Sequence, residues 1–411
     1  MPKRLLLIGG NYAPEPTGIG KFNGEMIGWL VSNGYECTVI TTYPYYPQWK
    51  VQEPYSRKAR WFRKEVSHEG RLKVYRCPQY VPADPSGKKR MVMDVSFAMA
   101  AFAQLMRILP SKKYDYVMSV VPSFHLGLLA LLYKRFRGAE VLYHIQDLQI
   151  DAARDLNMIR SGGMISAMLK LEKYILRKSD CVSSISDGMV RQISGKLDRR
   201  IELFPNWADV DKFHPLPGRM ALKEAFGFQP DHKVVLYSGA IGEKQGLESI
   251  LLAAASLEDR EDVQFVICGS GPYREKLHEK ALAMGLRRVH FLPLQPIEQF
   301  NRFLNMADLH LVIQKSGASD LVMPSKLTAI LAVGGLSLVT ANPGSSLHDL
   351  VSGYQLGIVV PAENQDALNA GIRNAVTGDH AGMRGNARSY AVEYLSIDKV
   401  MGRFEANVLK I

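Results

Sequence analysis

The chain has 411 residues, of which 47% are hydrophobic and 22% are charged, and this balance excludes a disordered chain. Its length exceeds what one ordinary hydrophobic core can serve, so two domains are expected. The four cysteines stand far apart without a Cys-x-x-Cys pair, which argues against a zinc site or a disulfide scaffold. No signal-peptide core and no apolar run of membrane-spanning length stands out, so a cytoplasmic protein is predicted.

The net charge of +11 is divided unevenly along the chain. Residues 1–200 carry 31 Lys and Arg against 17 Asp and Glu, a balance of +14, whereas residues 201–411 carry 20 against 23. A basic half favours contact with an anionic surface, either nucleic acid or the anionic face of a membrane. The apolar segment 88–113, with basic clusters at both ends, and the aromatic–basic stretch 59–65 suit a buried helix and a lipid-facing surface about equally.

The first half alternates short apolar or β-branched runs with helical patterns, which predicts a parallel sheet with helices on both faces. It opens with a strand at Arg4–Ile8, a turn with two prolines, and a helix from Phe22 to Val31. Later strands are expected at Cys37–Thr41, Leu72–Arg76, Tyr116–Val121, Glu140–Ile145, Cys181–Ile185 and Ile201–Phe204, with helices at 91–109, 124–136 and 163–178.

The segment Pro205–Pro217, rich in proline and aspartate, breaks this rhythm and is the predicted linker. The second half then repeats the scheme, with strands expected at Val234–Ser238, Val263–Cys268, His290–Leu292, Leu309–Gln314, Ser337–Thr340 and Gly357–Val360. We therefore predict an α/β fold of two Rossmann-like, doubly wound domains, 1–207 and 208–385, facing a central cleft. A last helix within 386–411 is expected to pack back on the first domain.

The stretch NYAPEPTGIGKF raises the first functional question. Gly18 and Gly20 leave backbone N–H groups uncovered where the first helix begins, and such amides together with the helix dipole suit a phosphate. An ordinary strand-to-helix turn explains the same residues about as well.

Several stretches, in this order and spacing, carry a family resemblance. The chain resembles family 4 retaining glycosyltransferases of the GT-B fold over nearly its whole length, and within them the fucosyltransferases of colanic-acid-type exopolysaccharide pathways. The matching stretches are NYAPEPTGIGKFNGEMIGWLVSNGYECTVIT, YPYYPQW, HIQDLQIDA, FPNWADVDKFHP, YSGAIGEKQGLESIL, VICGSGPYREKL and MPSKLTAILAVGG.

The resemblance implies transfer of a hexose from a nucleotide diphosphate donor to a lipid-linked saccharide, with retention of configuration. GDP-fucose is the best single prediction for the donor, and bacterial exopolysaccharide biosynthesis for the pathway. No metal, no cofactor and no nucleic acid is implied. The basic N-terminal domain would then meet an anionic membrane, as a peripheral protein on the inner face of the cell membrane.

The resemblance also implies donor-binding positions. Gly18 and Gly20 would lie under the diphosphate and the reacting sugar. Where the family usually clamps the diphosphate with an arginine and a lysine, this chain has Ala240 and then Lys244 or Gln245, so Lys244 is the candidate, with a solvated surface lysine as the alternative. Ser325 is expected to cap a helix that begins at about Lys326, and Lys326 to add a charge there.

Three side chains are candidates for the reacting centre. Asp147 fits the commonest family pattern at the end of the strand in HIQDLQID, His144 is the second choice, and Gln146 competes with both. A hydrogen-bonded structural role for His144 is about as well supported. Asp320 is the acid nearest to the usual sugar-binding glutamate, and the usual ribose-binding carboxylate has no counterpart.

Two other functions remain open at this point. A sugar-nucleotide epimerase can share the two-domain architecture, and would act without an acceptor. A non-enzymatic nucleic-acid-binding protein would explain the basic half, although no helix-turn-helix, zinc or RNA-binding signature accompanies it.

Overall fold

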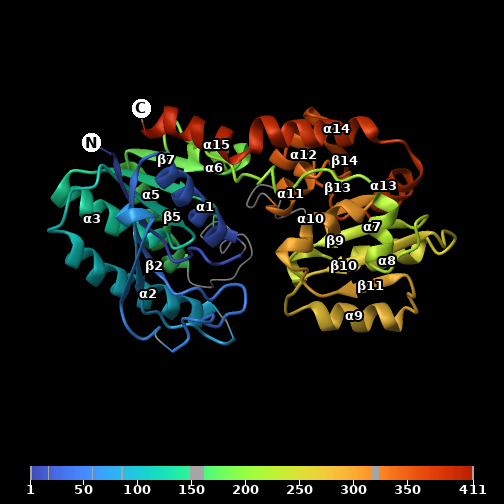
Figure 1. Cartoon of the computed structure of the whole chain (residues 1–411), viewed down its shortest axis with the longest axis horizontal. Helices are drawn as coiled ribbons and strands as arrows, with labels where there is room; N and C mark the ends of the chain where they lie inside the picture. Colours follow the sequence, from blue (N-terminus) through green and yellow to red (C-terminus); the bar gives the residue numbers. More distant parts are fainter. Residues whose placement is uncertain are drawn as a thin grey trace. The chain divides into compact units, whose positions relative to one another are not determined.

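The computed structural model describes residues 2–16, 18–57, 59–84, 87–148, 162–315 and 324–409. The chain forms two compact units, each an α/β body with its own sheet (Figure 1). Unit 1 comprises residues 1–205 together with 404–411, and unit 2 comprises residues 206–403.

Unit 1 is built on an eight-stranded sheet in the order β3-β4-β2-β1-β5-β6-β7-β8. All neighbouring strands run parallel except the edge strand β3, which is antiparallel to β4. The strands are β1 (Arg4–Ile8), β2 (Glu36–Thr42), β3 (Arg63–Ser67), β4 (Leu72–Cys77), β5 (Tyr116–Val121), β6 (Glu140–Ile145), β7 (Cys181–Ser184) and β8 (Glu202–Leu203).

The crossovers of unit 1 are helical, as parallel strands require. They are α1 (Gly18–Ser32), α2 (Gly87–Ile108), α3 (Gly127–Arg137), α5 (Gly162–Lys178) and α6 (Asp187–Ser194), with short 3₁₀ turns η1 (His68–Gly70) and η2 (Phe124–Leu126). The central strand β1 is buried from Leu5 to Ile8, which explains its continuous apolar run.

Unit 2 repeats the scheme with a six-stranded, all-parallel sheet in the order β11-β10-β9-β12-β13-β14. Its strands are β9 (Lys233–Ser238), β10 (Val263–Cys268), β11 (Val289–Leu292), β12 (Leu309–Val312), β13 (Ser337–Thr340) and β14 (Gly357–Val360). Its helices are α7 (Arg219–Ala225), η3 (Glu243–Gln245), α8 (Glu248–Ser256), α9 (Arg274–Ala283), α10 (Ile297–Met306), α11 (Lys326–Ala332), α12 (Ser346–Gly353), α13 (Gln365–Thr377) and α14 (Ala381–Tyr390).

The sheet of unit 2 separates two hydrophobic cores. Along β9, Val234 and Leu236 pack into one core, whereas Val235 and Tyr237 pack into the other. This alternation follows from the pleat, because successive side chains of a strand point to opposite faces. Both faces are covered by helices, so both sets of side chains must be apolar.

The secondary structure agrees with most of the sequence-based expectation. The bounds of β1, β5, β6, β10, β13 and β14 are those predicted. Two differences matter: α1 begins at Gly18 and not at Phe22, and β3 was missed. The sequence of β3, RKEVS, is polar and mostly exposed because the strand lies at the sheet edge, so it lacks the apolar run that marks the other strands.

The C-terminal segment is divided between the two units, unlike the single helix expected within 386–411. Helix α14 and the π-helical turn η5 (Ala391–Leu395) contribute Ala387, Ala391 and Leu395 to a core of unit 2. Helix α15 (Ile397–Phe404) ends where the chain joins unit 1, and there Phe404 stacks on Phe204 with ring centroids 4.0 Å apart.

Helix α2 corrects one expectation about membranes. Its 22 residues are long and apolar enough to cross a membrane by length and composition alone, whereas the sequence showed no run of that length. One such helix is weak support for a span, and a third of its most apolar window is buried within the protein. Met93, Phe97, Ala101 and Leu105 form this inner face.

Candidate functional site

The topology of unit 2 marks the place where a ligand is expected. From β9 the chain crosses first to β10 on one side and later to β12 on the other, so the loops after β9 and β12 diverge between neighbouring strands. Ligands of doubly wound sheets bind at such a switch point, at the carboxyl ends of the strands. The loop 239–242, residues 313–315 and the start of α11 meet this edge.

Lys326 joins two of these segments. Its Nζ lies 3.6 Å from the centroid of the Tyr237 ring, and a Cβ added to Gly239 would lie 2.8 Å from the same Nζ. The Tyr237 hydroxyl donates to the Ala240 carbonyl oxygen at 2.7 Å and so fixes the loop after β9. The ammonium therefore rests on an aromatic face and a glycine backbone, with no described carboxylate paired to it.

Burial lowers the pKa of Lys326 to about 7. The shift has a direct physical cause, because desolvation disfavours the charged form of an amine. An anionic group placed near Nζ would restore the charge. Lys326 is therefore suited to respond to a phosphate.

A second lysine lies beside the same loop and was not predicted from the sequence. Lys315 lies three residues beyond the end of β12 at Val312. It is exposed, and its stem covers Gly246. A Cβ added to Gly246 would lie 3.2 Å from Lys315 Cε. Its position in the sequence could have identified Lys315. A cation that follows β12, the fourth strand of this doubly wound sheet, stands at the switch point.

The glycine-rich loop of unit 1 surrounds a buried carboxylate. Glu15 is 3% exposed and accepts hydrogen bonds from the Tyr45 amide at 3.1 Å, the Tyr46 amide at 3.0 Å and Asn11 Nδ2 at 2.9 Å. Burial raises the pKa of Glu15, and these hydrogen bonds oppose the rise. A Cβ added to Gly20 would lie 2.7 Å from the Glu15 Cβ and would overlap its carboxylate.

This packing gives Gly20 a role that differs from the expected one. The space over Gly20 is filled by Glu15, so a side chain there would strain the loop itself before it reached any ligand. Gly18 has a different reason to be glycine, because its φ of +63° lies in the left-handed region. Its own Cβ position is open, with Tyr46 the nearest side chain at 3.7 Å.

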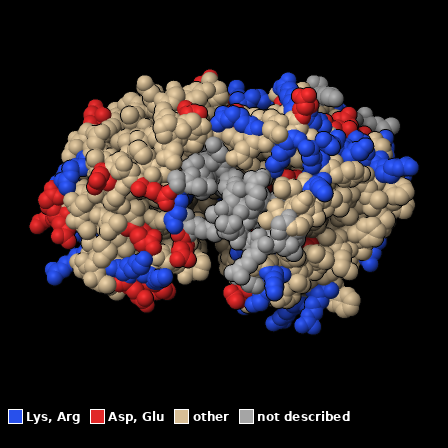
Figure 2. All heavy atoms as spheres, turned by 180° about the vertical axis from the view of Figure 1, so that it is seen from behind, with Lys and Arg blue, Asp and Glu red and all other residues tan. Residues whose placement is uncertain are grey.

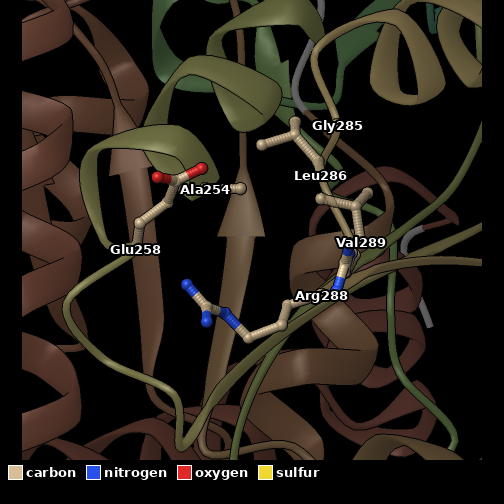
Figure 3. Close-up of a pocket in the computed structure, with 7 residues that line it drawn as sticks. Ala254, Glu258, Gly285, Leu286, Arg288 and Val289 are labelled. Atoms are coloured by element: carbon tan, nitrogen blue, oxygen red, sulfur yellow. The ribbon is translucent and has the colours of Figure 1, made fainter.

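Two cavities in the described residues lie away from the switch points. A cavity of about 250 Å³ is lined by residues 254, 258 and 285–289, between the end of α8 and the start of β11 (Figure 3). A second, of about 190 Å³, is lined by charged side chains such as Arg219, Lys233, Asp308 and Arg384 and by the end of α13. Both lie at the amino ends of strands, opposite the edge that binds ligands in this fold.

Comparison with known proteins identifies the family. Residues 17–207 match the glycosyl transferase 4-like domain and residues 219–393 match glycosyl transferases group 1. The chain is 39% identical, over 98% of both chains, to a protein of Escherichia coli K12 described as the putative colanic acid biosynthesis glycosyl transferase WcaI. The chain belongs to the group 1 glycosyltransferases.

Solved structures agree on the fold of this glycosyltransferase. The sucrose-phosphate synthase of Thermosynechococcus elongatus superposes with a TM-score of 0.76 over 98% of both chains, at 16% identity. WaaG, a glycosyltransferase of lipopolysaccharide biosynthesis, superposes with a TM-score of 0.67 over 98% of this chain and 99% of its own, also at 16% identity. These neighbours confirm the predicted GT-B fold, and the family favours a glycosyltransferase over the epimerase and the nucleic-acid-binding alternatives.

The donor-binding positions predicted for this glycosyltransferase can now be located. Lys326 begins α11 at the switch point, as described. Ser325 precedes it but makes no capping hydrogen bond, because its backbone is already helical and its side chain is exposed, so the predicted cap is wrong. Lys244 lies in η3, with a side chain outside the described residues, and Asp320 falls in the undescribed segment 316–323.

The candidates for the reacting centre differ in burial. His144 is 3% exposed, its Nδ1 lies 3.0 Å from Ser183 Oγ, and its ring lies 5.0 Å from the Phe204 ring. Burial lowers the pKa of His144 to about 3, so the imidazole is neutral at physiological pH. These contacts favour the structural alternative for His144. Gln146 is also buried, and Asp147, half-buried, lies two residues beyond β6.

The first prediction concerns the loop in unit 1. Gly20→Ala should lower the melting temperature and the transfer rate, because overpacking against Glu15 costs roughly 1–3 kcal/mol. Gly28→Ala on the same helix is the control, since no atom lies within 4 Å of its Cβ position. Differential scanning fluorimetry and a transfer assay on both variants check this. Equal stability of the two variants would contradict the packing at Glu15.

The second prediction concerns Lys326. Its proton is lost as the pH rises through about 7, and a bound diphosphate favours the protonated form, so affinity for a nucleotide diphosphate sugar should fall as the pH rises from about 6 to about 8.5. Lys326→Arg should remove this slope, because arginine stays charged. Lys326→Met should bind weakly at both pH values. Isothermal titration calorimetry measures all three, and an unchanged slope in Lys326→Arg would exclude Lys326 from the diphosphate site.

Proposed function

We propose that this glycosyltransferase moves a hexose from a nucleotide diphosphate donor to a lipid-linked saccharide in bacterial exopolysaccharide biosynthesis. The observation that carries the pathway is the 39% identity, along 98% of both chains, to a protein described as a colanic acid biosynthesis glycosyl transferase. L-Fucose from GDP-fucose is the proposed sugar and donor, on the resemblance of the loops quoted above. HepE of Anabaena, a structural neighbour with a TM-score of 0.69, was solved with UDP and glucose, which supports a nucleotide-sugar ligand as a class.

Lys326 supports an electrostatic role for unit 2 in the proposed reaction. Charge grows on the leaving diphosphate in the transition state, and a preorganised cation stabilises that charge. Lys326 and Lys315 flank the loop after β9, and Lys244 lies in the turn that follows it. We propose that retention of configuration follows from attack on the same face, with the leaving diphosphate accepting the proton of the acceptor hydroxyl.

We further propose that transfer needs no divalent metal. The sequence Asp209-Val-Asp211 could suggest a metal-binding pair, but Asp209 Oδ1 accepts a hydrogen bond from the Lys212 amide at 2.9 Å and so holds a turn. The Asp211 backbone oxygen is similarly engaged with His214 Nδ1 at 2.7 Å. Cations of the chain would take over the charge stabilisation that a metal gives elsewhere.

The outer face of α2 supports a membrane-bound acceptor. Five apolar side chains at helical spacing are 46–69% exposed on it, namely Met91, Val92, Val95, Met99 and Phe102. At the end of this stripe the Arg107 guanidinium lies 4.3 Å from the centroid of the Phe62 ring, next to the exposed Trp61. Lys88 and Lys89 stand at the start of α2. An amphipathic surface with basic ends suits the interface of an anionic bilayer.

The charge of unit 1 agrees with this surface. On the face drawn in Figure 2, Lys and Arg gather over unit 1, whereas Asp and Glu are more frequent over unit 2. The balance of +14 in residues 1–200 would draw unit 1 to anionic lipid, and the apolar stripe would then hold it. We propose a peripheral protein on the inner face of the cell membrane.

A donor panel tests the proposed activity. Thermal shifts with UDP-, GDP- and dTDP-sugars, all in the presence of EDTA, should single out GDP-fucose, because a ligand that binds only the folded state raises its melting temperature. Fucose transfer to lipid-linked saccharide should survive EDTA. A larger shift with another nucleotide sugar would reassign the donor, and strict dependence on magnesium or manganese would contradict the metal-free proposal.

Vesicle flotation tests the membrane surface. Met99→Glu should lower binding to anionic vesicles by about tenfold or more, because it places a charge in the apolar stripe. Met220→Glu is the matched control, since Met220 is 63% exposed on α7 of unit 2 and Met99 is 69% exposed on α2. Binding should also fall as salt rises. If the two variants bind alike, or if Met99→Glu instead breaks a dimer seen in light scattering, the surface does not serve lipid.

A further inference from the structure

The inner face of α2 carries a polar group that none of the assigned roles uses. Asp94 lies on this face, and its Oδ1 accepts a hydrogen bond from Ser123 Oγ at 3.2 Å. His125, in η2 just after β5, lies near the same carboxylate. Its Nε2 is buried and has no hydrogen-bond partner among the described residues.

The three side chains stand at the switch point of unit 1. There β5 lies beside β1, and the segments that leave these strands diverge toward η2 and toward the glycine-rich loop. Position 10, at the end of β1, faces the same helix, because a Cβ added to Gly10 would lie 3.9 Å from the Phe97 ring. Asp94 and His125 therefore occupy in unit 1 the place that Lys326 occupies in unit 2.

The charged and titratable groups around the pair come from four segments. Arg90 stands one turn before Asp94 on α2, with its guanidinium 4.8 Å from the centroid of the Trp49 ring. Tyr45, which follows β2, interacts with Asn11, Glu15 and Asp94. Burial raises the pKa of Asp94 and lowers that of His125, and each residue opposes the shift of the other. Each group therefore favours the charged form of the other.

A purely structural role explains only part of this arrangement. The bond to Ser123 anchors α2 to the loop after β5, but it leaves His125 Nε2 without a partner. A buried polar atom without a hydrogen bond is costly, so folded proteins rarely keep one without a reason. A carboxylate accepts hydrogen bonds only, and a neutral imidazole offers one donor and one acceptor. Together they match two hydroxyl groups of a sugar.

We propose that Asp94 and His125 bind hydroxyl groups of the acceptor saccharide, and so set which saccharide is used. This inference rests on the proposed function, because it assumes a saccharide acceptor. It makes α2 the element that links the two parts of a lipid-linked acceptor. The outer stripe contacts the lipid, and Asp94 on the inner face contacts the sugar.

The experiment compares the two faces of one helix. The probe is lipid-linked saccharide extracted from an Escherichia coli strain that produces colanic acid but lacks the 39% identical relative, tested intact and after release from its lipid. Asp94→Asn should raise the acceptor KM by about tenfold or more on both forms, since a charged hydrogen bond is lost. Vesicle binding and hydrolysis of the donor without acceptor should stay at wild-type values.

Val95→Glu, one position along on the outer face, is the control. It should reduce vesicle binding and transfer to the intact probe, and leave transfer to the released saccharide unchanged. His125→Gln should behave as Asp94→Asn does, and its melting temperature shows whether the fold is kept. Donor hydrolysis by the wild-type protein is measured in the same assays. If the wild-type protein does not hydrolyse the donor, the proposed function fails, whatever the result for Asp94→Asn.

Two results would overturn the inference. One is a wild-type acceptor KM in both Asp94→Asn and His125→Gln. The other is a parallel loss of donor hydrolysis and of transfer in folded Asp94→Asn, which would place the pair at the donor.

Discussion

The contact of the Lys326 ammonium with the Tyr237 ring and the Gly239 backbone is the interaction on which the proposed donor site depends. It exists because a doubly wound sheet brings the end of β9 beside the end of β12, and the chain then returns to this edge at α11. A residue larger than glycine at position 239 would collide with Nζ. The same burial that lowers the pKa of Lys326 makes the amine responsive to an anion.

Unit 1 uses the same topology with the opposite charge. Its switch point gathers Glu15 and Asp94, two carboxyl groups whose pKa values are raised by burial, around the loop that contains Gly18 and Gly20. Glu15 is held by three hydrogen bonds and acts as the packing centre of the loop. Asp94 has His125 beside it, whose Nε2 is unsatisfied. The cationic residues of unit 2 suit a diphosphate, and the carboxylate–imidazole pair of unit 1 suits sugar hydroxyls.

Features that a short stretch of sequence determines could be predicted, whereas features that bring distant residues together could not. Strands such as β1 and β10 are mostly apolar and buried, so the local sequence was enough to predict their bounds. The polar edge strand β3 has no such run and was missed. Lys326 was predicted as a donor-binding residue because a proline, a serine and an apolar helix follow one another in the sequence. Asp94 and His125 were not predicted, because 30 residues separate them along the chain and only the fold brings them together. The sequence left a catalytic and a structural role for His144 open, and its burial and its contact with Ser183 favour the structural role.

Hydrogen–deuterium exchange of the protein with and without GDP-fucose tests the central claim most directly, namely that the donor diphosphate binds at the switch point of unit 2. Binding should slow exchange in residues 239–246 and in the first turn of α11, and Lys326→Met should lose this protection at the same donor concentration. Protection confined instead to residues 254–258 and 285–289, which line the cavity at the amino ends of the strands, would contradict it.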